Sequence, residues 1–149
     1  LGVTDAFSHM EWFARPDGTV AISEIGARPP GAQISPMIGF AHDIDFYDLW
    51  ARLVVRDRFD RPDRVDACGT VCLRGLGRGR VRAVHGIDQL QRELGHLVVR
   101  AQLPQPGQPA ATSYEGEGFV TVRHEDTDVV REALERIVSL ARVEFVESD

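Results

Sequence analysis

The residues best suited to chemistry are two glutamates, Glu11 and Glu24, near the start of the sequence. The segment RPDG at residues 15–18 separates them and predicts a tight turn, which would fold the two carboxylates toward one another. Two converging carboxylates are costly unless a cation neutralises them. Mg²⁺ suits this role, because it prefers oxygen ligands and keeps waters and phosphate oxygens in its shell.

Arg28 follows the second acid within the segment SEIGARPPG, residues 23–31. Its planar guanidinium can hold a phosphate or a carboxylate through two parallel hydrogen bonds. Gly26 and Gly31 leave backbone room for a ligand to approach. These residue types indicate a site for a metal and a phosphate. The alternative is an ordinary hairpin with acids on its solvent face, and composition and spacing alone favour that alternative, because exposed glutamate is common.

Two strands must position these side chains. Residues 6–13, AFSHMEWF, alternate in polarity and predict a strand that carries His9 and Glu11 on one face. Residues 19–25, TVAISEI, predict the returning strand, with Glu24 near its end. His9 is either a third metal ligand or a hydrogen-bonding histidine, and the preference of Mg²⁺ for oxygen favours the second interpretation.

Helices are expected after this loop, from about Pro36 and more clearly from about Asp45. Either Asp43 or Asp45 can cap the second helix, whose apolar residues recur at helical intervals through Phe46, Leu49, Trp50 and Leu53. The polar, proline-containing stretch at residues 57–66 predicts a linker.

The sequence beyond this linker is rich in short β segments. Strands are expected over residues 67–75, 79–86, 96–103, 118–125 and 143–147, and helices over residues 87–94 and 126–142. The second helix carries an apolar stripe formed by Val129, Val130, Ala133, Leu134, Ile137, Val138 and Leu140. The glycines of GLGRGR, residues 75–80, favour a β-turn between the first two strands over a phosphate-binding loop, because the Lys-Ser/Thr of such loops is absent. We therefore expect an α+β protein with a first domain over residues 1–58 and a second over 59–149.

Composition excludes several classes of function. The chain has 149 residues and a net charge of -6, which disfavours a nucleic-acid groove. No apolar run approaches the roughly 20 residues of a membrane span, and no signal peptide is visible at the N-terminus. Cys68 and Cys72 are too far apart on one strand for a disulfide and are expected as free thiols, which fits a cytoplasmic protein. All 17 basic residues are arginine, so this chain contributes no lysine amine to a reaction.

The run HMEWF, the turn RPDG and the segment VAISEIGARPPG resemble the metal-binding end of the ATP-grasp ligases. That family places one acid on a strand, a second acid about a dozen residues later, and an arginine and a glycine in the next loop. The branch with the greatest similarity is the carboxylate–amine ligases related to L-amino acid ligase and biotin carboxylase. The remaining segments resemble the following helix, the accessory sheet and the last helix of that branch, so the resemblance implies the C-terminal portion of an ATP-grasp fold.

The resemblance also implies roles for four residues. Glu11 and Glu24 would ligate Mg²⁺, or Mn²⁺ as the alternative cation, bound to the phosphates of ATP. Arg28 would hold the γ-phosphate or an acyl-phosphate intermediate, and Gly31 would line the pocket for the attacking amine. The family usually carries asparagine, a further metal ligand, two residues after the second acid, whereas this sequence has Gly26 there.

By the same resemblance, the lysines that bind ATP phosphates and the adenine-binding segment come from earlier lobes of the family's chains. The expected partners are therefore these lobes of the same protein, a small-molecule carboxylate and an amine, with a homodimer as a further option, and neither nucleic acid nor a membrane. On this interpretation the parent protein is a ligase and residues 1–149 alone are inactive. The alternative is a non-catalytic module for dimerisation or lid support, and Gly26 keeps it open.

Overall fold

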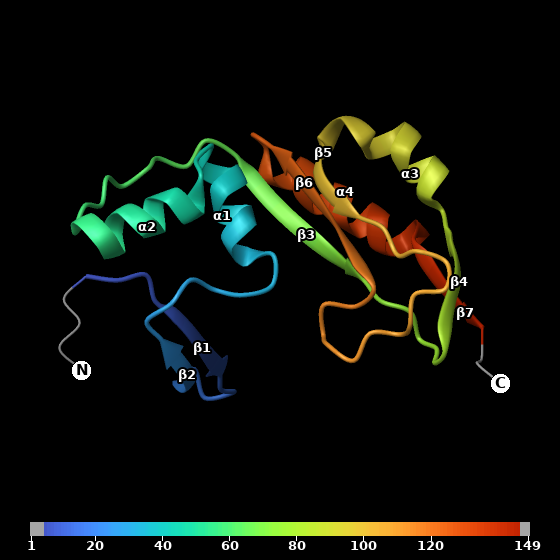
Figure 1. Cartoon of the computed structure of the whole chain (residues 1–149), viewed down its shortest axis with the longest axis horizontal. Helices are drawn as coiled ribbons and strands as arrows, with labels where there is room; N and C mark the ends of the chain where they lie inside the picture. Colours follow the sequence, from blue (N-terminus) through green and yellow to red (C-terminus); the bar gives the residue numbers. More distant parts are fainter. Residues whose placement is uncertain (1–4, 147–149) are drawn as a thin grey trace. The chain divides into compact units, whose positions relative to one another are not determined.

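The computed structural model describes residues 5–146 and divides the chain into two compact units (Figure 1). The first unit ends at Asp63 and the second begins at Arg64. This boundary lies within the polar stretch expected to be a linker, five residues beyond the expected end of the first domain at residue 58.

The first unit opens with an antiparallel hairpin of β1 (His9–Ala14) and β2 (Val20–Gly26). Interactions between neighbouring residues form the turn of this hairpin. Gly18 adopts a positive φ of 81°, which glycine tolerates without steric cost. The Asp17 carboxylate accepts hydrogen bonds from the backbone N–H and the hydroxyl of Thr19, and these bonds lower the pKa of Asp17. The segment RPDG therefore forms the predicted turn.

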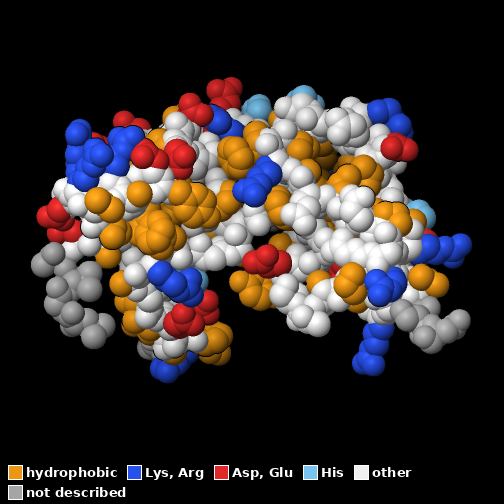
Figure 2. Space-filling view, viewed as in Figure 1, with side chains coloured by type: hydrophobic (Ala, Val, Ile, Leu, Met, Phe, Trp, Pro, Cys, Tyr) orange, Lys and Arg blue, Asp and Glu red, His pale blue; other side chains and the backbone are white. Residues whose placement is uncertain are grey.

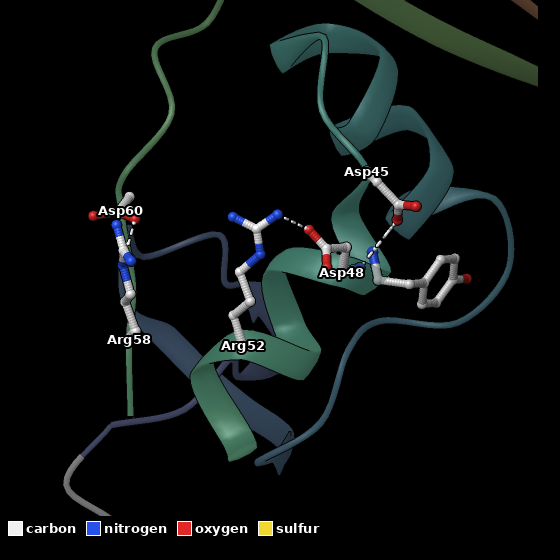
Figure 3. A network of polar contacts seen from close by, with 6 residues as sticks. Asp45, Asp48, Arg52, Arg58 and Asp60 are labelled. Atoms are coloured by element: carbon white, nitrogen blue, oxygen red, sulfur yellow. Dashed lines mark hydrogen bonds and ion pairs between the residues drawn. The ribbon is translucent and has the colours of Figure 1, made fainter. Parts of the chain in front are cut away.

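Two helices follow, α1 (Ile34–His42) and α2 (Phe46–Arg56). Asp45 caps α2 by accepting hydrogen bonds from the backbone N–H groups of Tyr47 at 2.9 Å and Asp48 at 3.0 Å (Figure 3). Asp43 does not cap α2 but lies at the end of α1 in a left-handed conformation.

The small core of this unit is aromatic. Phe46 is buried and its ring lies 4.9 Å from that of Phe7, which also contacts Phe59 edge-on at 5.6 Å between ring centroids. Leu53, two helical turns further along α2, is also buried. Trp50, which the helical spacing assigned to the same stripe, is instead 38% exposed at its margin.

Over its described residues, 64–146, the second unit contains two separate antiparallel sheets. The first has the strand order β3 (Ala67–Leu73), β6 (Gly118–His124), β5 (Val98–Gln102), and the second pairs β4 (Arg80–His85) with β7 (Arg142–Val146). The helices are α3 (Ile87–Leu94), a short 3₁₀ helix η1 (Gly95–Leu97), and α4 (Thr127–Leu140). Residue 147, the last of the final strand predicted from sequence, lies outside the described residues.

The core of the second unit lies between α4 and the three-stranded sheet (Figure 1). From α4 the buried residues are Val130, Ala133 and Ile137, and Leu134 is partly buried against them. Val138 was predicted in this stripe, but it is 60% exposed. The buried stripe is thus narrower than the sequence suggests, because Val138 lies on the side of the helix that faces solvent.

The glycines of residues 75–80 do not form the predicted β-turn, because β3 and β4 belong to different sheets and do not pair. Gly75 and Gly77 instead pack against the ring of Phe145, where an added Cβ would lie as close as 2.7 Å to the ring at Gly77. Close backbone approach to an aromatic ring therefore explains these glycines. The loop is also held by Glu117, whose buried carboxylate accepts hydrogen bonds from the N–H groups of Gly75 at 3.0 Å and Ala111 at 2.8 Å.

No helix among residues 5–146 has the length and apolarity needed to cross a membrane. Cys68 and Cys72 are free thiols, as expected.

Candidate functional site

Glu11 and Glu24 lie directly opposite one another in the register of the hairpin. The next pair is Trp12 with Ile22, so Ser23 is an extra, unpaired residue that forms a β-bulge. The bulge interrupts the regular alternation of side-chain directions along β2 between Ile22 and Glu24. As a result Glu24 shares a face with Glu11, while Ile22 shares the opposite face with Trp12.

Arg28 reaches back to this pair. Its Nη2 donates to Oε1 of Glu24 at 3.2 Å, and its Nη1 donates to the backbone carbonyl of Pro29, also at 3.2 Å. The two side chains of the ion pair are about half exposed, 51% for Arg28 and 54% for Glu24. The predicted phosphate-binding arginine and the predicted second acid are therefore direct partners in this structure.

Gly26 lies beneath the side chain of Arg28. A Cβ added at Gly26 would lie 3.4 Å from Cγ and 3.5 Å from Nε of Arg28. Arg28 therefore passes close over position 26 on its way to Glu24, with room for a Cβ in ordinary van der Waals contact but little room beyond it.

The loop that carries these residues is anchored to α1. The buried hydroxyl of Ser35 donates to the carbonyl of Pro30 at 2.7 Å, and the N–H of Ile34 donates to the carbonyl of Gly31 at 3.2 Å. A Cβ added at Gly31 would meet no atom within 4 Å. Open space beside Gly31 is compatible with a ligand pocket there.

The donor set fits a magnesium ion that is shared with a substrate. Among the described residues, no group of three or more His, Cys, Asp or Glu side chains could hold a metal. Mg²⁺, however, is usually bound by one or two carboxylates together with substrate phosphates and waters. Two opposed carboxylates beside an arginine match that pattern and do not match a closed structural metal site.

Sequence reasoning did not anticipate three buried polar atoms in the first unit. Nδ1 of His9, Nδ1 of His42 and Oε1 of Gln33 are buried and have no hydrogen-bond partner within the described residues. The hydrogen bond expected of His9 is therefore not formed at that nitrogen. His9 lies on the face of Glu11, opposite Gly26 in the register, and Gln33 directly precedes α1. Sequence carries no signal for such atoms, because their burial depends on how the loop packs.

A cavity of about 490 Å³ lies in the second unit, away from the hairpin, and is lined by the end of β3, the end of α4 and β7. Its walls are mostly apolar. Arg142 at its edge donates to the carbonyls of Val138 and Ala141 and so caps α4. Burial raises the pKa of the Cys72 thiol in this cavity, which disfavours the reactive thiolate. The hairpin and its loop therefore remain the stronger candidate site.

No protein-family model and no curated protein matches the chain. Several solved structures do match it. An L-amino acid ligase from Bacillus licheniformis superposes with a TM-score of 0.74 and 17% identity, over 98% of this chain and 39% of that chain. An N5-carboxyaminoimidazole ribonucleotide synthetase from Thermotoga maritima (TM-score 0.63, 18% identity) and a phosphoribosylglycinamide synthetase from Anaerococcus prevotii (TM-score 0.63, 13% identity) each match over 93% of this chain and 37% of their own.

These three proteins are ATP-grasp enzymes, so the resemblance inferred from the sequence motifs and the α+β fold class are confirmed at the level of fold. The chain has the fold of part of an ATP-grasp protein. It spans less than two fifths of the length of each of the three structures.

Proposed function

We propose that this chain is part of an ATP-dependent carboxylate–amine ligase. In that reaction ATP transfers its γ-phosphoryl group to a carboxylate, and an amine then displaces phosphate from the acyl phosphate. The products are an amide, ADP and phosphate. The observation that carries the proposal is the opposition of Glu11 and Glu24 with Arg28 beside them, on a fold shared with ATP-grasp enzymes.

The roles of the site residues follow from their chemistry. Glu11 and Glu24 would hold Mg²⁺, which neutralises phosphate charge when it is bound. Arg28 would turn its two-pronged guanidinium to the transferred phosphoryl group or to the acyl phosphate, where it stabilises developing negative charge. The open space beside Gly31 would admit the amine. Mn²⁺ would serve the same carboxylates.

The missing parts of the site would come from other lobes of the same protein. One face of the hairpin carries four large apolar side chains with exposed fractions of 46–67%, from Met10, Trp12, Ile22 and Ile25. Apolar side chains of the first unit are visible at its surface (Figure 2). A two-stranded hairpin is marginal by itself, so a covering lobe would stabilise it. We propose a cytoplasmic location for the ligase because its cysteines are free, and a homodimer as its assembly.

Two observations favour a different function. Gly26 supplies no side-chain ligand, and no three-donor metal cluster is present in residues 5–146. A non-catalytic module, kept for dimerisation or lid support, would also show these features.

Magnesium-dependent ADP release by the protein that includes the remaining lobes separates the two functions. If the protein is a ligase, ADP release should require both a carboxylate and an amine, and Glu24→Ala should abolish it. Arg28→Lys should lower turnover well below that of the unchanged protein without affecting folding, because lysine keeps the charge but not the two-pronged contact. Full turnover by Glu24→Ala would favour the non-catalytic module.

A further inference from the structure

The ion pair between Arg28 and Glu24 occupies the carboxylate that the proposed function gives to a metal. Nη2 of Arg28 lies 3.2 Å from Oε1 of Glu24. A carboxylate oxygen engaged by a guanidinium is less available to a cation, and the positive charge of Arg28 opposes a second positive charge at the same oxygen. Arg28 and a divalent cation therefore compete for Glu24.

We propose that Gly26 is a positioning residue, because the absence of a branched side chain at this position permits the competition. It allows Arg28 to fold back onto Glu24 when no cation is bound, and a cation releases Arg28 to face the phosphate. In the free protein Arg28 acts as the counter-ion of Glu24, so the two opposed carboxylates are partly neutralised before the metal arrives. This inference rests on the proposed metal site and assigns to Gly26 a role beyond leaving room for a ligand.

Small and branched side chains at position 26 should affect Arg28 differently. A Cβ would lie 3.4 Å from Cγ and 3.5 Å from Nε of Arg28, which is ordinary van der Waals contact, so alanine is tolerated with Arg28 in place. Valine adds two Cγ atoms beyond that Cβ, and we expect them to crowd the Arg28 side chain, which already lies 3.4 Å from the Cβ position. Gly26 has no positive φ, and valine favours extended backbone, so β2 can accept it.

The test measures Mn²⁺ affinity of the chain itself, by paramagnetic broadening of backbone amide signals of the hairpin in NMR spectra. Gly26→Val and Arg28→Gln should both tighten Mn²⁺ binding roughly two- to fivefold, the range expected when an exposed ion pair no longer competes. Gly26→Ala is the matched control for backbone effects and should bind like the unchanged chain. Arg15→Gln, in the hairpin turn, removes one positive charge without touching Glu24 and should tighten binding less than Arg28→Gln.

The outcomes distinguish this inference from the metal site on which it rests. Glu24-dependent Mn²⁺ binding that is equal in the alanine and valine variants would overturn the role of Gly26 alone. Equal tightening by Arg15→Gln and Arg28→Gln would also overturn it, because net charge would then explain the effect. Hairpin broadening that is absent, or unaffected by Glu24→Ala, would overturn the metal site itself and this inference with it.

Discussion

Glu11 faces Glu24 across the β1–β2 hairpin, and only Glu24 has Arg28 as an ion-pair partner. Like charges directly opposite one another destabilise an antiparallel pair. The hairpin therefore carries an electrostatic cost that a cation would relieve.

Glu11→Gln should consequently stabilise the first unit when metal is removed with a chelator, by roughly 0.2–1 kcal/mol. The same substitution should abolish any stabilisation by added Mg²⁺, because a ligand is lost. Tryptophan fluorescence during urea unfolding reports this unit selectively, since both tryptophans, Trp12 and Trp50, belong to it. Glu135→Gln, at an exposed position of α4, is the charge-matched control and should change neither quantity. If Glu11→Gln instead lowered the stability of the metal-free hairpin, Glu11 and Glu24 would not repel one another as proposed.

Gly69 and Leu134 form a coupled pair in the core of the second unit. A Cβ at Gly69 would lie 2.5 Å from Cδ1 of Leu134. Gly69→Ala should therefore cost about 1–3 kcal/mol through overpacking, and Leu134→Ala about 2 kcal/mol, the low end for leucine because the side chain is only partly buried.

The double variant should be more stable, by at least about 0.5 kcal/mol, than the sum of the two losses predicts. Truncation of Leu134 removes the atom that an alanine Cβ at position 69 would clash with, and that Cβ in turn fills part of the space that Leu134 leaves. Circular dichroism during urea unfolding measures all three values. Val138→Ala, on the exposed side of the same helix, is the control and should stay within about 0.5 kcal/mol. Strict additivity would show that Leu134 does not contact Gly69.

Glu93 gives a pH-dependent prediction. Arg136 of α4 donates two hydrogen bonds to the Glu93 carboxylate, at 2.8 and 3.1 Å, and Gln89 donates a third at 2.8 Å. These bonds lower the pKa of Glu93 from 4.5 to about 2. Because the pKa is lower in the folded state, this contact stabilises the fold above about pH 4.5, and its contribution is lost as the pH falls toward 2.

Carbon-13 NMR titration of the side-chain carboxyl should place its midpoint near 2 in the unchanged chain. Arg136→Gln should move the midpoint back toward 4.5. A midpoint already near 4.5 in the unchanged chain would mean that the contact between α3 and α4 does not persist in solution.

Local signals in the sequence predicted the elements well, for physical reasons that can be named. The turn of the hairpin follows from Asp17 and Gly18, and the start of α2 follows from the capping carboxylate of Asp45. Each of these interactions joins residues only a few positions apart. The same is true of α3, whose observed bounds equal the predicted ones.

Long-range features could not be predicted in this way. β3 pairs with β6 and β4 with β7, and no local pattern selects one strand partner over another. The buried Glu117 lies between Gly116 and Gly118, and no local pattern in the sequence indicates that its side chain is buried. At the candidate site, residue types and order indicated a metal and a phosphate, but the contact of Arg28 with Glu24 depends on a side-chain conformation and on the space above Gly26.

The chain of 149 residues should not by itself release ADP from ATP at a useful rate. It contains no lysine, and it spans only 39% of the L-amino acid ligase structure that it matches. Two carboxylates bind Mg²⁺ weakly unless substrate phosphates complete the shell, and here Arg28 is turned toward Glu24. Positioning contributes roughly 7–11 kcal/mol to well-oriented reactions, so its loss leaves little activity. A coupled ADP-release assay on the purified chain tests this, with Glu24→Ala as the control for contaminating ATPases. Release that disappears in Glu24→Ala would establish that residues 1–149 contain a complete active site.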